Sequence, residues 1–276
     1  MTQNQKSRAE IFRALHAREG CFVIPNPWDA GSARLLWTLG FEALATTSLG
    51  FALTLGHADG AITSDQALQH VRDLAAAALL PLSADLENGF ADDPGDAAET
   101  IRLAAEAGAV GGSIEDYTPA PRPRIYDFNH AVERVAAAVE CSRSLGFPFT
   151  LTARAENLIR GVDDLDDTIQ RLQAFEKAGA DVLYAPGLKT HEQVRAVCSA
   201  VSRPVNVLAM PGLTVAGIAE AGGKRISLGS WLARAVAGSL VSAAEEISQR
   251  GSFTFGGRAL TSARVLQLLE GGKGQS

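Results

Sequence analysis

The sequence predicts an α/β protein built as one (β/α)8 barrel of the TIM type. Eight short apolar runs, each with the length of a buried strand, alternate with helical runs at intervals of about 25 to 35 residues. Several helical runs end in a glycine that leads straight into the next apolar run, as in Ala107-Gly-Ala109 and Ala178-Gly-Ala180. No linker interrupts this repeat. We therefore expect residues 1–276 to form a single domain, with about 250–276 as a C-terminal extension.

The expected strands are short apolar runs, most of them bounded by Gly, Pro, Asn or Asp. In chain order they are 21–25, 41–46, 81–85, 109–115, 148–154, 180–184, 204–208 and 225–229. Consecutive strands separated by a helix are typical of parallel pairing, which closes into a barrel when the unit repeats eight times.

Helical periodicity and capping residues define the segments between these strands. Asp29 is placed to cap the helix that follows it, and Thr63 or Ser64 to cap the next one, while Gly40, Gly146 and Gly179 are placed to end the helices that precede them. In chain order the expected helices are 7–18, 29–39, 64–80, 93–107, 128–145, 162–178, 190–201, 213–221, 231–249 and 259–270. The last two exceed what a minimal barrel needs.

The composition argues against several classes of protein. The formal net charge is -6 and no basic patch is present, so neither nucleic acid nor an anionic membrane is an expected partner. No apolar run approaches the ~18 residues of a membrane-spanning helix, and the polar N-terminus lacks the apolar core of a signal peptide. Cys21, Cys141 and Cys198 are widely spaced, which argues against disulfides and a zinc motif. We expect a cytoplasmic protein.

Four carboxylates stand at the ends of two neighbouring apolar runs, in Asp85-Leu-Glu87 and Glu115-Asp116. The period of a strand puts Asp85 and Glu87 on one face, and the next parallel strand brings Glu115 beside them. Converging carboxylates repel each other unless a cation neutralises them, and oxygen ligands favour Mg²⁺ or Mn²⁺. The alternative interpretation is that these are solvated loop acids that cap the following helices.

In a barrel of this type, functional residues lie at the carboxyl ends of the strands. The sequence places polar side chains there, namely Asp29, Thr47, Ser48, Asp85, Glu87, Glu115, Asp116, Arg154 and Glu156. This agreement between topology and polar placement supports the barrel and locates its candidate site.

These residues lie in motifs that, in their order and spacing, resemble the isocitrate lyase/phosphoenolpyruvate mutase superfamily from about Ile24 to Trp231. The motifs are Asn26-Pro-Trp-Asp29, Thr47-Ser-Leu-Gly50, Gly56-His-Ala-Asp59, Asp85-Leu-Glu-Asn-Gly89, Ser113-Ile-Glu-Asp116, Thr152-Ala-Arg-Ala-Glu156 and Arg225-Ile-Ser-Leu-Gly229. The resemblance implies a barrel with Mg²⁺ at its mouth that binds a 2-oxo acid or its enolate. It also implies a homodimer or homotetramer in which the last helix is exchanged between subunits.

By the same resemblance, Asp85 binds the cation directly, while Glu87 and Glu115 hold waters on it. Thr47 and the backbone N–H groups that follow it would clamp the substrate carboxylate, and Arg154 would hold the carboxylate or the enolate oxygen by a forked contact. The whole implied substrate-binding set is Trp28, Asp29, Thr47, Ser48, Leu49, Asp85 and Arg154.

The loop after the fourth strand departs from the family pattern. Isocitrate and methylisocitrate lyases carry a Lys-x-Cys-Gly-His loop with cysteine as the general acid, whereas residues 117–127 here contain no Cys, Lys or His. Efficient isocitrate lyase activity of the usual type is therefore not expected. Tyr117 also occupies the position of a lysine that mutases and hydrolases carry, which weakens the case for phosphonate reactions.

The catalytic candidates are Arg154, Asp59 and His57. Asp59 lies where phosphonopyruvate-processing relatives carry an aspartate, and it is either a gating group, nucleophile or base, or simply a turn residue. His57 is either a proton donor or a solvated loop histidine.

Other side chains leave the choice of reaction open. Arg122 and Arg124 either reach a distal carboxylate when the 117–127 loop closes as a lid, or form a solvated basic turn. Tyr126 and Tyr184 act as acids or pack in the core.

We therefore expect a Mg²⁺-dependent (or Mn²⁺-dependent) carbon–carbon lyase or decarboxylase. Its substrate is expected to be a small 2-oxo or 2-hydroxy (di)carboxylic acid that reacts through a cation-stabilised enolate. The alternatives are a phosphonopyruvate mutase or hydrolase, and a barrel that binds 2-oxo acids with little turnover.

Overall fold

Eight parallel strands form the central sheet of the computed structural model, which describes residues 3–119 and 123–271. Their order is β1-β10-β9-β8-β7-β4-β3-β2, and a hydrogen bond from Ala45 N–H to the Pro25 carbonyl (3.0 Å) links the two edges. The strands are β1 (Phe22–Ile24), β2 (Leu44–Ala45), β3 (Leu82–Asp85), β4 (Gly111–Glu115), β7 (Thr150–Arg154), β8 (Val182–Tyr184), β9 (Val205–Leu208) and β10 (Arg225–Ser227). The predicted TIM-type barrel is confirmed.

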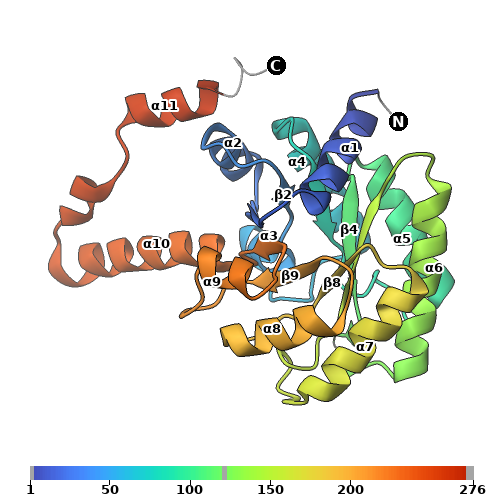
Figure 1. Ribbon diagram of the computed structural model, residues 1–276. Coiled ribbons are helices and arrows are strands. Elements are labelled where there is room, and N and C mark those ends of the chain that lie inside the picture. The colour runs from blue at the N-terminus through green and yellow to red at the C-terminus, as the bar shows by residue number, and fades with distance from the viewer. Residues whose placement is uncertain (1–2, 120–122, 272–276) are drawn as a thin grey trace.

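Helices pack around this sheet, and the last of them form an arm that projects away from it (Figure 1). They are α1 (Gln3–Ala17), α2 (Ala30–Thr38), α3 (Ser48–Thr54), α4 (Ser64–Ala77), α5 (Pro94–Glu106), α6 (Phe128–Ser144), α7 (Leu165–Ala178), α8 (His191–Ala200), α9 (Val215–Glu220), α10 (Trp231–Arg250) and α11 (Ser262–Glu270), with a short 3₁₀ helix η1 at Thr254–Arg258. Asp29 and Thr63 cap α2 and α4 as predicted, and Gly179 ends α7 at φ 104°.

Two local elements were not predicted. The first is α3, which begins where a strand was expected to run into a loop. The second is a hairpin of β5 (Tyr117–Thr118) and β6 (Arg124–Ile125) in the loop after β4. Both lie at the carboxyl ends of the strands and therefore border the candidate site.

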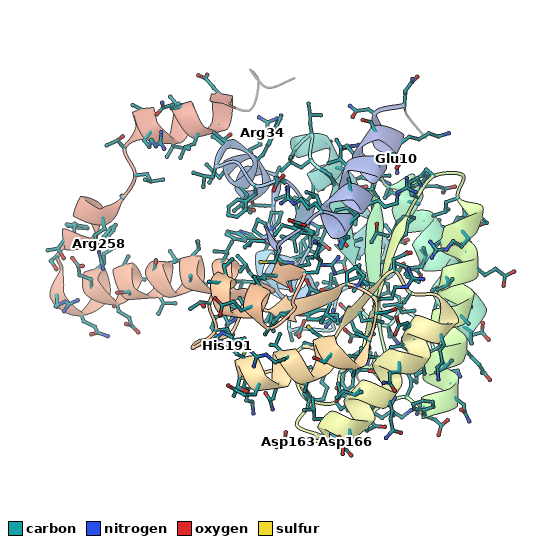
Figure 2. The ribbon with its side chains drawn as sticks, in the orientation of Figure 1. Glu10, Arg34, Asp163, Asp166, His191 and Arg258 are labelled. Carbon is teal, nitrogen blue, oxygen red and sulfur yellow. The ribbon has the colours of Figure 1, made fainter. Side chains whose placement is uncertain are left out.

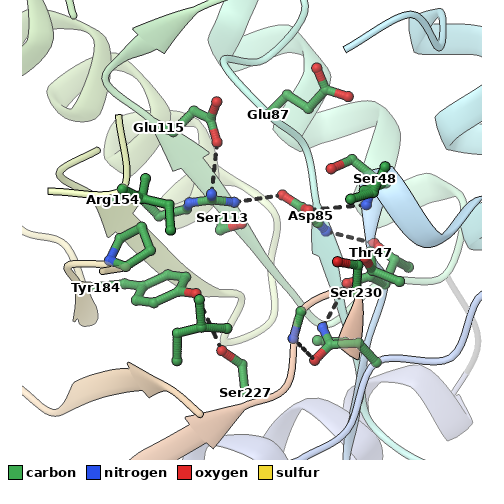
Figure 3. Close-up of a pocket in the computed structure, with 18 of the residues that line it drawn as sticks. Thr47, Ser48, Asp85, Glu87, Ser113, Glu115, Arg154, Tyr184, Ser227 and Ser230 are labelled. Atoms are coloured by element: carbon green, nitrogen blue, oxygen red, sulfur yellow. Dashed lines mark hydrogen bonds and ion pairs between the residues drawn. The ribbon is translucent and has the colours of Figure 1, made fainter. Parts of the chain in front are cut away.

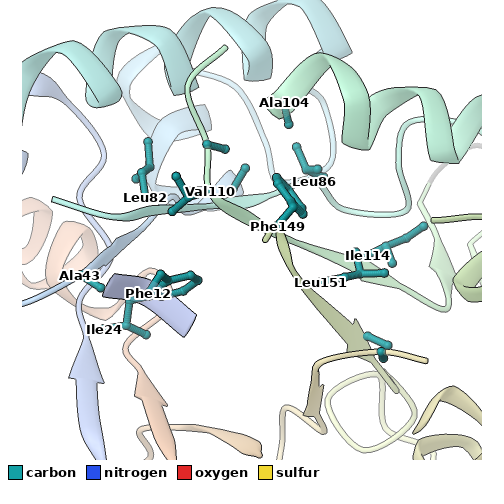
Figure 4. Close-up of a cluster of buried hydrophobic side chains, with 14 of the residues drawn as sticks. Phe12, Ile24, Ala43, Leu82, Leu86, Ala104, Val110, Ile114, Phe149 and Leu151 are labelled. Carbon is teal, nitrogen blue, oxygen red and sulfur yellow. The ribbon is translucent and has the colours of Figure 1, made fainter. Parts of the chain in front are cut away.

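The core fills the barrel and the space between its strands and helices (Figure 4). Helix α1 closes the amino-terminal end of the barrel with Phe12, which is fully buried. Gly111 makes room for this ring, since a Cβ there would lie 2.8 Å from Phe12 Cε1. Charged side chains such as Asp163 and Asp166 lie exposed on the outside of the molecule (Figure 2). With one end of the barrel closed, the site can only open at the other.

The C-terminal arm (residues 231–271) leaves the barrel earlier than expected. The extension was placed at about 250, but α10 already projects away from the barrel from Trp231 onward (Figure 1). Its apolar side chains Val236, Leu240 and Val241 are 56%, 70% and 54% exposed. The chain then returns, and α11 meets α2 through a hydrogen bond from Thr38 Oγ1 to the Leu268 carbonyl (2.7 Å). An exposed apolar helix of this kind suits burial against another surface.

Within residues 3–119 and 123–271, we find no helix with the length and apolar character needed to cross a membrane.

Candidate active site

The carboxyl ends of the strands open into a cavity of about 720 Å³ to which all eight strands of the barrel contribute lining residues. Its ionisable lining is unusually rich in carboxylates and guanidinium groups. The acids are Asp59, Asp85, Glu87, Glu115 and Glu156, and the arginines are Arg154, Arg160, Arg225 and Arg234. The predicted location of the site at this end of the barrel therefore agrees with a large cavity that these charged groups line.

Arg154, the last residue of β7, is the centre of the charge network (Figure 3). Its guanidinium lies 2.8 Å from Asp85 Oδ1, 2.9 Å from Glu115 Oε2 and 2.8 Å from Glu156 Oε1. Burial alone would lower the pKa of Arg154, but the three carboxylates raise it well above its usual range. A forked contact between Arg154 and a substrate, as predicted, requires a substrate oxygen to displace one of these carboxylates.

Thr47, Ser48 and Leu49 form the start of α3 and line the cavity. Thr47 caps the helix by accepting a hydrogen bond from Gly50 N–H on its Oγ1 at 3.3 Å. Ser48 N–H donates to Asp85 Oδ2 at 3.2 Å. The residues of the predicted carboxylate clamp are therefore together, at a helix N-terminus that faces the acids. Their role in binding a substrate stays a prediction.

Glu87 reaches the cavity by a different route from the one predicted. Strand β3 ends at Asp85, and Glu87 follows in a left-handed backbone conformation with φ 48°, which few non-glycine residues adopt. Its Oε1 is buried and has no hydrogen-bond partner among the described residues. Burial and, after it, the charge of Asp85 raise the pKa of Glu87 to about 7. Such a strained, unsatisfied acid is typical of a functional site.

Arg160 joins the network although no motif indicated it. Its Nη2 lies 3.4 Å from Glu115 Oε1, and its Nε donates to Glu156 Oε2 at 3.2 Å. The guanidinium lies 3.8 Å from the centre of the Tyr117 ring, in a cation–π contact. Burial and the charge of Glu156 raise the pKa of Glu115 well above its usual range. Arg160 lies in an irregular turn after β7. In such a segment the sequence has no helical or strand periodicity from which the direction of a side chain could be predicted.

The acids suit a hard divalent cation. All the candidate ligands are carboxylate oxygens, Glu87 Oε1 lacks a partner, and the acids of this cluster outnumber Arg154 and Arg160. In the described ranges, no group of three or more His, Cys, Asp or Glu side chains is arranged to hold a metal ion. A cation here would therefore take few protein ligands directly and keep several waters, as Mg²⁺ commonly does.

The predicted catalytic residues Asp59 and His57 are separated by the structure. Asp59 lines the cavity although its side chain is exposed, and partial desolvation there, followed by the charge of Asp85, raises its pKa. His57 is exposed and is not among the described residues that line the cavity. The solvated-loop interpretation of His57 therefore fits the structure better than a proton donor.

Trp28 and Asp29 are not among the described residues that line the cavity, and their part in binding a substrate stays a prediction. Both border a separate hollow of about 450 Å³ beside α2, α3 and α4. Asp29 Oδ1 accepts a hydrogen bond from Ser32 N–H at 2.6 Å, which completes the N-cap of α2. The helix cap holds this acid on the outer side of the strand end.

The described part of the hairpin after β4 contributes Tyr117 and two prolines to the cavity. Pro119 and Pro123 line it, whereas Arg124 is directed to Asp92, with Nη2 and Oδ2 3.9 Å apart. Arg122 lies outside the described residues. Closure of this loop as a lid stays a prediction.

Two further candidates, Asp116 and Tyr126, have structural partners. Asp116 is buried and accepts hydrogen bonds from Glu156 N–H at 2.8 Å and from Arg171 Nη1 at 3.0 Å. The Tyr126 hydroxyl donates to Asp92 and accepts from Asn88. Neither residue lines the cavity within the described ranges.

The fold and the site define a (β/α)8-barrel protein with an arginine-bridged cluster of acids at its strand ends. The model of the phosphoenolpyruvate phosphomutase family matches residues 12–248. The chain therefore belongs to this family, and its predicted place in the isocitrate lyase/phosphoenolpyruvate mutase superfamily is confirmed.

Three relatives illustrate the similarity. A solved structure from Burkholderia cenocepacia J2315, provisionally assigned as a lyase/mutase, is 55% identical and covers 96% of each chain, with a TM-score of 0.93. The 2-methylisocitrate lyase of Escherichia coli K12 is 30% identical over 72% of this chain and 69% of its own. The oxaloacetate decarboxylase of Rhodopseudomonas palustris BisB18 is 31% identical over 72% and 70%. The chain thus belongs to a family of enzymes that break carbon–carbon bonds.

Proposed function

We propose that this protein is a divalent-cation-dependent lyase or decarboxylase. Its substrate would be a small 2-oxo or 2-hydroxy (di)carboxylic acid. The observation that carries the proposal is the bridging of Asp85 and Glu115 by Arg154 beside the start of α3. This arrangement sets a fixed positive charge and the N-terminus of a helix beside a cavity large enough for a small acid.

Binding of the substrate rests on the start of α3 and on Arg154. The α3 N-terminus, with the Thr47 hydroxyl, would orient the carboxylate. Arg154 would hold the substrate oxygen adjacent to that carboxylate. In doing so it would give up one of its carboxylate partners in the protein. Asp85 contacts both Arg154 and Ser48 N–H, so it keeps these two binding groups in register.

Mg²⁺ or Mn²⁺ would bind at Asp85, with Glu87 and Glu115 reaching it through water. When bound, the cation supplies positive charge beside the oxygen on which negative charge develops. The unsatisfied Glu87 Oε1 supports this assignment, and so do the raised pKa values of Glu87 and Glu115, which come first from burial and then from neighbouring carboxylates, because a bound cation would offset both effects.

Asp59 is the proposed base for a 2-hydroxy acid. Its raised pKa brings it closer to neutrality, where a carboxylate is an effective proton acceptor. Removal of the hydroxyl proton lets a carbonyl form as the adjacent carbon–carbon bond breaks. The electron pair of that bond passes to the leaving carbon as an enolate, whose charge Arg154 balances.

We also propose a homo-oligomer, a dimer or tetramer. The support is the projecting arm, on which Val236, Leu240 and Val241 expose an apolar surface. This surface would be buried most simply if α10 of one copy packed against the barrel of a second copy of the chain.

A panel of acids tests the proposed reaction. The enzyme is incubated with MgCl₂ and oxaloacetate, isocitrate, 2-methylisocitrate, 2,3-dimethylmalate or phosphonopyruvate, and formation or loss of 2-oxo acid is followed. We expect turnover of at least one carbon acid, abolished by EDTA. Turnover of phosphonopyruvate alone would favour the phosphonate alternative. Binding of these acids with no turnover would favour a binding protein.

A further inference from the structure

A second polar group lies deeper in the barrel, below the acids. Tyr184, at the end of β8, lines the cavity together with Asn206, Arg225 and Ser227. Figure 3 shows the Tyr184 ring beside Arg154, with its hydroxyl linked to Ser227. The Arg154 guanidinium lies 5.3 Å from the centre of this ring. The mechanism proposed above assigns no role to Tyr184.

These residues form a chain of hydrogen bonds that begins at a group able only to donate. Arg225 Nε donates to Asn206 Oδ1 at 2.8 Å, and an arginine cannot accept. The amide of Asn206 is thereby fixed, so its Nδ2 faces Ser227 and donates to Oγ at 2.9 Å. Ser227 Oγ, having accepted this bond, is left with its own proton, which it donates to the Tyr184 oxygen at 3.4 Å.

The origin of the chain is a buried cation that no carboxylate balances. Besides Asn206, Arg225 contacts Thr152 Oγ1 at 3.0 Å and His16 Nε2 at 3.3 Å. Burial and the charge of Arg225 lower the pKa of His16 to about 3, so this imidazole is neutral and accepts on Nε2. Because every partner of Arg225 among the described residues is a neutral acceptor, its donors cannot reverse, and the direction of the chain is fixed as far as Ser227.

The proton of the Tyr184 hydroxyl is the free end of this chain. Its oxygen accepts from Ser227, which is the one hydrogen-bond partner of this hydroxyl found among the described residues. Burial raises the pKa of Tyr184 to about 12, so the phenol keeps its proton throughout the neutral range. A donor without an acceptor on the wall of a cavity is suited to a ligand atom that carries negative charge.

We propose that Tyr184 is the proton donor of the reaction and that Arg225, Asn206 and Ser227 orient it. The inference rests on the proposed function, since it supplies the acid that a lyase or decarboxylase needs. The electron pair of the broken carbon–carbon bond forms a new C–H bond with the Tyr184 proton. The phenolate left behind takes a proton from solvent as the product leaves.

Tyr184→Phe tests this role with the full-length enzyme and MgCl₂, first with oxaloacetate and then with every other acid of the panel that the wild type turns over. We expect kcat to fall about 10²- to 10⁴-fold, the range for loss of a general acid. We expect KM, and the Kd of oxalate by calorimetry, to stay within about threefold. Tyr126→Phe is the matched control, because it removes a buried phenol that lies outside the cavity, and it should keep kcat.

Ser227→Ala tests the orienting chain. It should lower kcat about tenfold in the wild-type background and have no further effect in Tyr184→Phe, because the chain acts only through Tyr184. In D₂O, the wild type should place deuterium on one face of the product carbon, whereas Tyr184→Phe should lose this preference as the enolate is protonated in solution.

The outcomes separate this inference from the proposed function. If the wild type turns over a carbon acid but Tyr184→Phe keeps kcat within threefold, the proton donor is a different group and the proposed function survives. If Tyr184→Phe weakens oxalate binding as much as it lowers kcat, Tyr184 is a binding residue and the inference is overturned. If the wild type turns over none of the acids, both proposals fall.

Discussion

Arg154 on β7 reaches across β4 to Asp85 on β3, where its Nη1 lies 2.8 Å from Asp85 Oδ1. The contact joins strands that are not neighbours, and it holds the binding cation of the site beside the first turn of α3, because Asp85 also accepts from Ser48 N–H. Neither charge is free to move without the other. The site is therefore organised before any ligand enters it, which is the condition for strong electrostatic stabilisation of a reacting group.

Asp85→Asn should abolish turnover without unfolding the protein. The amide keeps an oxygen and the size of the side chain but loses the charge that positions Arg154 and would bind the cation. We expect kcat/KM to fall at least about 10³-fold, and stability to change little because Glu115 and Glu156 still pair with Arg154. Steady-state kinetics and thermal unfolding measure the two effects.

Asp163→Asn is the matched control for this substitution. Asp163 is exposed on the outer surface, and its replacement removes the same charge far from the cavity (Figure 2). If Asp85→Asn keeps the wild-type kcat/KM in MgCl₂, the assignment of Asp85 to the active site is wrong.

Glu87→Gln should stabilise the cation-free protein above neutral pH. The pKa of Glu87 is raised from its ordinary value of 4.5 to about 7 in the folded state, so ionisation favours unfolding. The free energy of unfolding of the wild type in EDTA should fall as pH rises from about 4.5 through about 7. The loss is on the order of 2 to 3 kcal/mol, and Glu87→Gln should lack it. Urea unfolding at a series of pH values gives this difference directly.

MgCl₂ supplies the internal check on Glu87. A cation that neutralises the cluster should restore stability to the wild type at pH 8, and it should stabilise Glu87→Gln less, because this variant lacks one charge of the cluster. Equal stability of the two proteins in EDTA at pH 5 and pH 8 would show that Glu87 is not strained by charge.

Leu240→Asp should separate the subunits of the proposed oligomer. Leu240 is 70% exposed on α10, and a charge there opposes burial of the arm against a second copy. We expect the wild type to elute as a dimer or tetramer in size-exclusion chromatography with light scattering, and the variant as a smaller species. Leu79→Asp places the same charge on an exposed leucine outside the arm and should leave the mass unchanged. A monomeric wild type at micromolar concentration would refute the oligomer.

The barrel itself could be predicted because its signals are local and repeated. The eight strands follow from apolar runs, and caps such as Asp29 and Gly179 are read from single residues. The short helix α3 was missed because seven residues carry too little periodicity, and the sequence around Thr47 reads equally well as a strand end. The departure of α10 from the barrel was missed because an amphipathic period does not say which surface the helix covers.

The site was predicted in part. Asp85, Glu115 and Arg154 stand at strand ends, so topology alone brings them together. Glu87 arrives through a left-handed turn, and Arg160 through an irregular segment, and neither geometry is encoded in residue spacing. The chain from Arg225 to Tyr184 depends on side chains that meet across the inside of the barrel, which only the packed structure reveals.

Calorimetric titration with oxalate tests the central claim most directly, because oxalate resembles the planar enolate of a 2-oxo acid and requires no knowledge of the substrate. In MgCl₂ the wild type should bind oxalate at least about 100-fold more tightly than in EDTA, a difference of about 2.7 kcal/mol. Asp85→Asn should lose this enhancement, while Asp163→Asn should keep it. Equal affinity in MgCl₂ and in EDTA would contradict a cation-dependent enolate site built on Asp85 and Arg154.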